Sequence, residues 1–146
     1  MDEINIDGVI STPLKIIETP GGNVKHAVKA SDKGFESFGE AYFSYIEPGS
    51  IKAWKKHKEM TMNLIVPQGR IKFVIYDDRE GSTTKGAFQE VIVGEDNYVR
   101  VTVPPMVWMG FAGVDNKVSM LLNVSNIEHR PEEQERKSLE EIDYNW

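Results

Sequence analysis

The chain has 146 residues, of which 40% are hydrophobic and 27% are charged, and it carries a formal net charge of −6. This length and composition are typical of one globular domain, and we expect residues 1–146 to form a single domain. The negative charge argues against a nucleic-acid partner, because binding to phosphates needs a basic surface. The chain has no cysteine, which excludes disulfides, thiolate metal sites and a cysteine nucleophile.

The sequence has no features of an export signal or a membrane span. Its first residues, MDEINIDG, are acidic, unlike the start of a signal peptide. No apolar run approaches the roughly 20 residues of a membrane span. We therefore expect a soluble, cytoplasmic protein with no membrane partner.

In chain order, the sequence consists almost entirely of short strand-like runs separated by turn residues. Residues 4–29 hold short apolar runs broken by prolines and glycines, which predict two or three short strands. Further strands are predicted at 40–47, 51–55, 61–66, 70–77, 87–93, 98–103, 107–113 and 118–124. Regular short strands with turns between them indicate an antiparallel sandwich or barrel.

Alternation along two of these runs predicts which side chains share a face. Ile71, Phe73 and Ile75 alternate with other residues, as in a half-buried strand. Tyr42 and Ser44 share one face of their strand, and the neighbouring aromatic residues share the other.

The end of the chain has a different pattern. Pro131 suits a first helical turn, acidic residues follow it, and the apolar positions thin out to Leu139 and Ile142. We predict one short C-terminal helix over residues 131–142.

Two segments have the residue spacing of the two sequence blocks of a cupin barrel. The first is GSIKAWKKHKEMTMNLIVPQG at 49–69, and the second is VPPMVWMGF at 103–111. The four positions that usually hold metal ligands are here Lys55, His57, Met62 and Met109. Lysine is charged and methionine is too soft for zinc, manganese or iron(II), so a single histidine remains. We therefore expect no metal and no cofactor.

Several motifs, in their order and spacing, resemble those of the dTDP-4-dehydrorhamnose 3,5-epimerase family, the RmlC-like cupins that lack a metal. The matching stretches cover most of the chain: GVI at 8–10, KAWK at 52–55, QG at 68–69, DDREGS at 77–82 and VPPMVWMGF at 103–111. The resemblance implies an all-β fold, an antiparallel jelly-roll β-barrel of the cupin type. It also implies a homodimer that acts on a small-molecule nucleotide sugar.

Members of this family epimerise a 4-keto sugar attached to a nucleotide. The resemblance implies a histidine that removes the proton beside the ketone, a lysine that holds the enolate, and a tyrosine that returns a proton on the other face. Here the base position is Lys55, the lysine position is Met62, and residues 118–122 contain no tyrosine. The usual catalytic set is therefore replaced in this chain.

Lys55 and His57 lie two residues apart on one strand face and are the candidate catalytic residues. Lys55 could act as a base if burial lowers its pKa, or it could bind a phosphate or keto oxygen; the alternative is a solvated lysine. His57 could act as an acid or base, and the alternative is a structural histidine whose hydrogen bonds are satisfied.

Six further residues are candidates for substrate binding. A guanidinium binds phosphate oxygens well, so Arg79 could hold a diphosphate, or it could pair with a neighbouring aspartate. Aromatic rings could stack on a base or a sugar, or they could fill the core. The six candidates are Arg79, Tyr42, Trp54, Trp108, Met62 and Met109.

Two functions remain open. The first is an epimerase or isomerase of a nucleotide sugar, such as a dTDP-4-keto-6-deoxyhexose, in surface-polysaccharide or deoxysugar biosynthesis, with a substituted active site. The alternative is a non-catalytic cupin that binds a sugar or a partner protein, or that serves as a structural subunit. An open polar pocket containing Lys55 and His57 favours the enzyme, whereas a pocket filled by Met62, Met106 and Met109 favours the binding protein.

Overall fold

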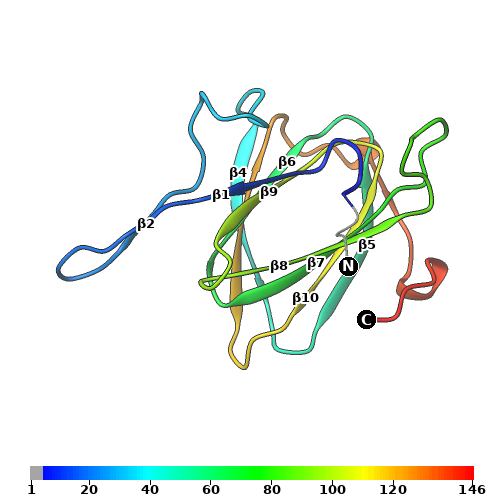
Figure 1. Cartoon of the computed structure of the whole chain (residues 1–146). Coiled ribbons are helices and arrows are strands. Elements are labelled where there is room, and N and C mark those ends of the chain that lie inside the picture. Colours follow the sequence, from blue (N-terminus) through cyan, green and yellow to red (C-terminus); the bar gives the residue numbers. More distant parts are fainter. Residues whose placement is uncertain (1–4) are drawn as a thin grey trace.

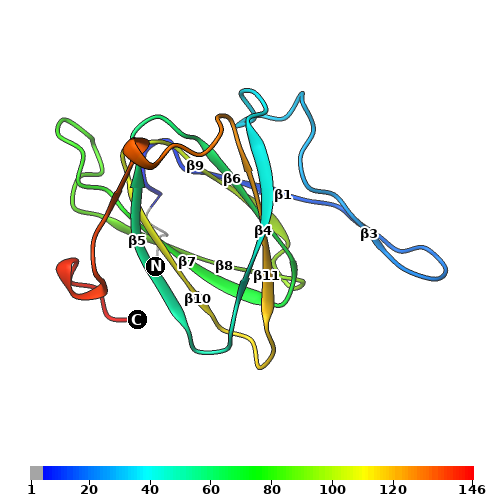
Figure 2. The same cartoon turned by 180° about the vertical axis from the view of Figure 1, so that it is seen from behind.

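Strands make up nearly all of the regular structure in the computed structural model, which describes residues 5–146. Two five-stranded sheets face each other (Figures 1 and 2). The first contains, in spatial order, β1 (Ile10–Pro13), β9 (Val99–Val103), β6 (Met62–Gln68), β11 (Ser119–Ser125) and β4 (Glu40–Ile46). The second contains β12 (Gln134–Arg136), β5 (Ile51–His57), β10 (Trp108–Gly113), β7 (Arg70–Tyr76) and β8 (Phe88–Gly94). Strand pairing in both sheets is antiparallel, which confirms the predicted all-β antiparallel architecture.

The predicted strands from residue 40 to residue 124 are all present, with small shifts at their ends. The N-terminal stretch contains β1 and two very short strands, β2 (Ile16–Ile17) and β3 (Val24–Lys25), in agreement with the prediction of two or three strands. The first residue of that stretch, Ile4, lies outside the described residues.

The core lies between the two sheets. Ile71, Phe73 and Ile75 of β7 are completely buried, as their alternation predicted. Val101 and Val103 of β9, in the other sheet, belong to the same apolar cluster. The hydrophobic effect therefore holds the two sheets together along their facing sides.

A tight turn at Gly69 joins β6 to β7. Its φ of 88° is a left-handed conformation that glycine adopts without strain. A Cβ at this position would lie 2.2 Å from Oγ of Ser119 and 2.7 Å from its Cα. That hydroxyl accepts a hydrogen bond from the backbone N–H of Arg70 at 2.9 Å, so the absence of a side chain lets the turn close onto β11.

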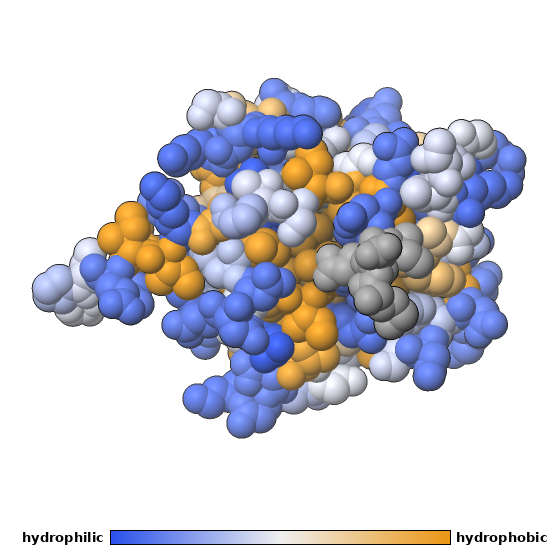
Figure 3. All heavy atoms as spheres, viewed as in Figure 1, coloured by the Kyte–Doolittle hydropathy of each residue, from blue (hydrophilic) through white to orange (hydrophobic). Residues whose placement is uncertain are grey.

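The strands β2 and β3 pair with each other and form an arm that projects from the two sheets (Figures 1 and 2). Its apolar side chains Ile17 and Val24 are 42% and 50% exposed. Apolar atoms on the arm are visible in Figure 3, away from the main body of the protein.

The prediction of a C-terminal helix is wrong. Residues 131–142 form two 3-10 turns, Pro131–Glu133 and Leu139–Glu141, separated by the edge strand β12. The backbone of β12 pairs with β5, so the sheet satisfies hydrogen bonds that a helix would have made internally. Within residues 5–146, no helix is long and apolar enough to cross a membrane.

The apolar residues near the C-terminus follow a period of two, which suits an extended chain better than a helix. Ile142, Tyr144 and Trp146 pack against Trp54 on the outer side of β5. The indole Nε1 of Trp54 also donates a hydrogen bond to the carbonyl of Leu139 at 3.3 Å. The C-terminal segment therefore covers the second face of this sheet.

A buried carboxylate organises the loop after β7. Asp77 is fully buried and accepts hydrogen bonds from Nε and Nη2 of Arg79, both at 2.9 Å. The hydroxyls of Ser82 and Thr84 each donate to the same carboxylate at 2.6 Å. Hydrogen bonds from Arg79, together with these hydroxyls, hold the pKa of Asp77 well below its usual range, although burial acts in the opposite direction.

We expect Ile142→Ala to destabilise the protein by about 2–4 kcal/mol, because it removes a buried side chain from the aromatic cluster. Ile142 is 6% exposed, whereas the nearby Leu139 is 38% exposed. Leu139→Ala is therefore the matched control and should lower the free energy of unfolding much less than Ile142→Ala does. Urea denaturation of both variants measures the difference, and equal losses of stability would contradict the packing described here.

We expect Asp77→Asn to lower the free energy of unfolding at pH 7 by about 3–5 kcal/mol, because it leaves Arg79 without its anion. The folded-state pKa of Asp77 is lowered, so its stabilising effect is present above its unfolded pKa of about 3.9 and is lost as pH falls. The difference between wild type and variant should therefore shrink from pH 7 to pH 3. Urea denaturation curves at pH 7 and pH 3 measure this difference in the free energy of unfolding. The control is Asp143→Asn, which changes an exposed aspartate. A difference of the same size at both pH values would contradict the prediction.

Candidate functional site

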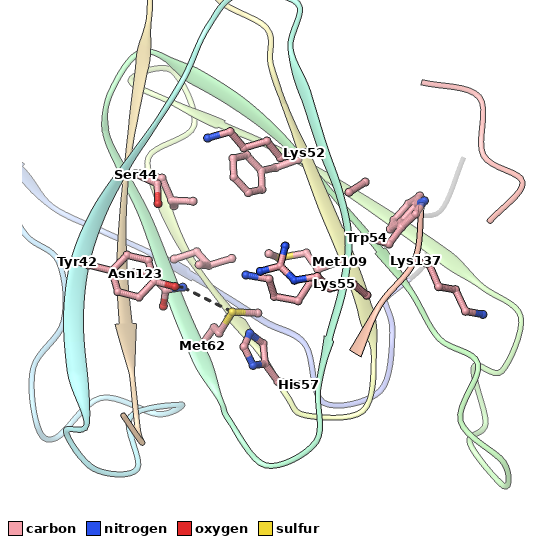
Figure 4. A pocket seen from close by; sticks show the side chains of 15 residues that line it. Tyr42, Ser44, Lys52, Trp54, Lys55, His57, Met62, Met109, Asn123 and Lys137 are labelled. Carbon is pink, nitrogen blue, oxygen red and sulfur yellow. Dashed lines mark hydrogen bonds between the residues drawn. The ribbon is translucent and has the colours of Figure 1, made fainter. Parts of the chain in front are cut away.

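A cavity of about 420 Å³ lies between the two sheets. Side chains from β4 and β11 line one wall, β5 and β10 line the opposite wall, and β6 contributes Met62 and Leu64. Arg136, at the end of β12, also reaches it. Residues far apart in the sequence therefore meet in one hollow, whose labelled side chains are seen in Figure 4.

A bulge in β5 gathers lysines on the cavity side. Lys55 pairs with Met109 and Lys52 with Phe111, so the two residues between them on β5 oppose a single residue, Gly110, on β10. The extra residue reverses the strand's alternation, and Lys52 therefore lies on the same side as Lys55 and His57. Figure 4 shows these three side chains along one wall.

The cavity is positively charged. Its lining includes Lys52, Lys55 and Arg136, and none of the described residues that line it is an aspartate or glutamate. Because charges interact more strongly in a partly enclosed site than in bulk water, such a lining attracts an anion. The cavity is cationic although the whole chain has a net charge of −6.

His57 is only 5% exposed and is oriented by a buried carboxylate. Its Nδ1 donates a hydrogen bond to Oε1 of Glu133 at 2.7 Å. The other oxygen of Glu133 accepts hydrogen bonds from the backbone N–H groups of Glu59 and Met60, at 3.0 and 2.9 Å. Glu133 thus fixes the ring tautomer and leaves Nε2 of His57 without a hydrogen-bond partner among residues 5–146.

The pKa values favour a neutral ring and an ionised carboxylate. Burial lowers the pKa of His57, and the hydrogen bond and charge of Glu133 only partly oppose that effect. Burial raises the pKa of Glu133, but hydrogen bonds from His57 and from the two backbone N–H groups outweigh it, so the net pKa is lowered. At neutral pH, Nε2 therefore carries a lone pair that can accept a proton.

Lys55 is half-buried in the same wall. Burial lowers the pKa of its ammonium group, the neighbouring Arg136 lowers it further, and Glu133 opposes both effects. Lys55 is therefore not a freely solvated lysine, and its ammonium group faces the cavity (Figure 4).

The opposite wall carries neutral polar groups. Tyr42 and Ser44 of β4 both line the cavity, so they share one face of the strand, as their alternation predicted. Asn123 of β11 lies beside Tyr42. The side chain of Asn123 donates a hydrogen bond to the Tyr42 hydroxyl at 3.0 Å and contacts Sδ of Met62 at 3.6 Å (Figure 4).

Most of the candidate residues named from the sequence meet at this cavity. Those that line it are Lys55, His57, Tyr42, Trp54, Met62 and Met109. The ring of Trp54 nevertheless points away from the hollow, toward the C-terminal aromatic cluster (Figure 4). Its main contacts are therefore structural.

Two candidates lie elsewhere. Arg79 is paired with Asp77 and also donates to the carbonyl of Asp7 at 2.6 Å, which is the structural alternative considered from the sequence. Trp108 packs on the outer side of the second sheet, where its indole Nε1 donates to Asp78 at 2.9 Å. Neither residue lines the cavity.

The methionines do not fill the pocket. Met62 and Met109 form parts of its walls and leave the space open, while Met106 is 42% exposed and does not line it. Of the two alternatives considered from the sequence, the pocket filled by methionines is therefore not the one that the described residues form. The open polar cavity containing Lys55 and His57 is the arrangement that favours an enzyme.

Three residues of the site were missed from the sequence. Glu133 and Arg136 fell in the segment predicted as a helix, so nothing indicated that they reach β5. Asn123 carried a weak signal, because it alternates with the inward-facing Leu121 and is a polar residue at a core position. Within residues 5–146, no group of three His, Asp or Glu side chains is placed to hold a metal ion.

No protein-family model matches the chain. Among curated proteins it is similar to the probable low-salt glycan biosynthesis epimerase Agl13 of Haloferax volcanii, with 37% identity over 84 residues. That match covers 57% of this chain and about half, 54%, of the relative's length.

Two solved structures are similar over almost the whole chain. The dTDP sugar isomerase from Desulfovibrio desulfuricans G20 is 39% identical with a TM-score of 0.90, and the match covers 92% of this chain and 87% of that one. The dTDP-4-dehydrorhamnose 3,5-epimerase from Sulfolobus tokodaii is 22% identical with a TM-score of 0.83, and the match covers 98% of this chain and 85% of that one. At this level of identity, the second match supports the fold alone. The chain therefore belongs to the RmlC-like family of sugar-nucleotide epimerases and isomerases, to which dTDP-4-dehydrorhamnose 3,5-epimerase also belongs.

Proposed function

We propose that the protein epimerises or isomerises a keto sugar carried on a nucleoside diphosphate, in surface-polysaccharide or deoxysugar biosynthesis. The observation that carries the proposal is a neutral histidine, held by a buried carboxylate, that faces an open cationic cavity. A diphosphate sugar is an anion of suitable chemistry for that lining. The similarity to a dTDP sugar isomerase and to a glycan biosynthesis epimerase supports the same substrate class.

The proposed base is Nε2 of His57, which takes the proton from the carbon beside the ketone. The imidazolium that forms is stabilised by the charge of Glu133. Removal of the proton makes an enolate, whose negative oxygen needs a nearby cation or hydrogen-bond donor. Lys55 is the proposed cation, because its ammonium group faces the same cavity.

The remaining cavity residues have simpler proposed roles. Lys52 and Arg136 would attract the diphosphate, and Met62 and Met109 would form apolar walls around the sugar. No metal or other cofactor is part of the proposal.

A non-catalytic role is the second candidate. The observations that favour it are Met62 at the family's lysine position and the lack of a tyrosine at 118–122. In that case the cavity would bind a nucleotide sugar without exchanging its protons.

We also propose that residues 1–146 form a single cupin domain of the jelly-roll type, acting in the cytoplasm as a homodimer. The strand orders support the jelly roll, because most neighbours in each sheet are distant in sequence. The exposed apolar side chains Ile17 and Val24 on the projecting arm support self-association, since isolated apolar arms gain stability when covered.

To test the catalytic proposal, dTDP-4-keto-6-deoxyglucose is incubated with the protein in deuterated water, and deuterium at C3 and C5 is followed by NMR. We expect the wild type to incorporate deuterium. His57→Gln should slow incorporation by about 10²–10⁴-fold because the base is lost, and Lys55→Met should slow it because the enolate loses its cation.

The matched controls are His26→Gln, which lies outside the cavity, and Lys58→Met, which is exposed after β5. Both should incorporate deuterium at the wild-type rate. Binding of the sugar nucleotide without incorporation by the wild type would support the non-catalytic role, and neither binding nor incorporation would overturn the substrate class.

The pH dependence of exchange gives a second test. His57 must be neutral to accept a proton, and burial lowers its pKa. In a plot of kcat/KM against pH, the acidic limb, where activity falls because His57 becomes protonated, should therefore lie below pH 6.5. Glu133 raises the pKa of His57, so Glu133→Gln should move that limb to still lower pH and reduce the plateau. Exposed Glu132→Gln is the control and should leave the limb in place. A limb that moves to higher pH in Glu133→Gln would refute the assignment of His57 as base.

A further inference from the structure

Lys55 differs from the other lysines of β5 in its lack of a partner. Within residues 5–146, its ammonium group forms no ion pair and no hydrogen bond. By contrast, Lys52 donates a hydrogen bond to a backbone carbonyl at 2.8 Å, and Lys56 forms an ion pair with Asp78 at 3.5 Å. Lys55 therefore presents to the cavity an amine that no described group of the protein engages (Figure 4).

The surroundings of Lys55 favour the uncharged amine. Lys55 pairs with Met109 on β10, and Met62 lines the same cavity, so apolar side chains replace part of the water that an ammonium ion needs. Burial lowers the pKa of the Lys55 ammonium group, Arg136 opposite it on β12 lowers it further, and Glu133 raises it. At neutral pH, more of Lys55 is therefore a free amine than of an exposed lysine, and a free amine is a nucleophile.

A proton acceptor lies beside this amine. His57 is two positions along β5, on the same cavity wall. Its Nδ1 donates to Glu133, so its Nε2 carries a lone pair and has no hydrogen-bond partner among residues 5–146. The cavity of about 420 Å³ thus offers a ketone both an amine that can bond to its carbonyl carbon and a base for the adjacent carbon.

We propose that Nζ of Lys55 bonds to the ketone carbon of the sugar and forms an imine, a Schiff base, during the reaction. This inference rests on the proposed function. It makes Lys55 a covalent partner of the ketone, in place of a charged neighbour of the enolate.

The chemical steps balance with water as the only co-reactant. The lone pair of Lys55 Nζ attacks the carbonyl carbon. The carbonyl oxygen leaves as water, with one proton from the amine and one from the solvent, and a protonated imine remains. Nε2 of His57 takes the proton of the adjacent carbon, and the electrons of that C–H bond form a neutral enamine. A proton then returns to carbon, and water adds to the imine, which releases the ketone, the free amine and a proton.

The other basic residues that line the cavity are less suited to this bond. Lys52 is already hydrogen bonded, and Nζ of Lys137 lies 4.9 Å from the centre of the Trp108 ring, on the outer side of the sheet. The guanidinium of Arg136 stays charged and is not a nucleophile. An imine at Lys55 also places a positive nitrogen directly on the substrate, where it takes up the electron pair that an enolate would leave on oxygen.

Reductive trapping tests the proposal on the unchanged protein. The protein is incubated with dTDP-4-keto-6-deoxyglucose and sodium cyanoborohydride, which reduces a protonated imine to a stable secondary amine. We expect the protein to gain the mass of the sugar nucleotide less one oxygen atom, because water leaves and two hydrogen atoms are added. Peptide mass mapping should place this adduct on Lys55 and not on Lys52 or Lys56.

A second measurement also needs no variant. In water that carries a heavy oxygen isotope, each round of imine formation and hydrolysis replaces the ketone oxygen with one from water. The wild type should therefore exchange this oxygen faster than the sugar nucleotide does alone, and mass spectrometry measures the exchange.

Three variants separate a covalent role from a role of charge alone. Lys55→Arg keeps a positive charge but cannot form an imine, whereas Lys55→Met removes both. We expect both variants to lose the adduct and to lose deuterium incorporation to the same extent. A lysine that acts only through its charge would leave Lys55→Arg faster than Lys55→Met. Lys58→Met changes an exposed lysine outside the cavity, and it should keep the adduct and the wild-type rate. Thermal melting of each variant confirms that it is folded.

The outcomes are distinguishable. If the wild type neither incorporates deuterium nor forms an adduct, the proposed function is overturned, and the imine with it. If it incorporates deuterium but forms no adduct and exchanges no ketone oxygen, only the imine is overturned. An adduct on Lys55, combined with faster incorporation by Lys55→Arg than by Lys55→Met, overturns the imine as a step of the reaction. An adduct on Lys55 with equal loss in both variants supports the proposal.

Discussion

The buried carboxylate of Glu133 is the contact on which the site and the C-terminal segment both depend. One oxygen accepts a hydrogen bond from His57, and the other accepts from two backbone N–H groups just after β5. These bonds join the C-terminal segment to β5 immediately before β12 pairs with that strand. A buried charge with this many donors is stable where it lies, and it sets the tautomer of His57 at the same time.

The two faces of β5 serve different purposes. Trp54 packs outward with Tyr144 and Trp146, and that aromatic cluster fixes the strand in place. Lys55 and His57 face inward to the cavity. The rigid outer packing therefore positions an inner wall of charged groups, whose burial would otherwise be costly.

The sequence predicted a large part of the fold and about half of the site. Short runs with strand alternation located the strands, and the spacing around Gly49 and Gly69 predicted the pair Lys55 and His57 on one face. Glu133 was missed because it lies 76 positions from His57, and no local pattern records such a contact. The helix prediction for its segment failed because pairing with β5 outweighed a favourable N-terminal turn.

The sequence by itself determined the strand positions and the family resemblance, because these depend on residue identity, short-range alternation and fixed spacing. Only the tertiary structure decided that the methionines leave the cavity open, that Arg79 pairs with Asp77, and that Asn123 holds Tyr42 opposite His57. Those outcomes depend on which distant side chains share a space and satisfy one another's charges and hydrogen bonds, and that is settled only when the two sheets close.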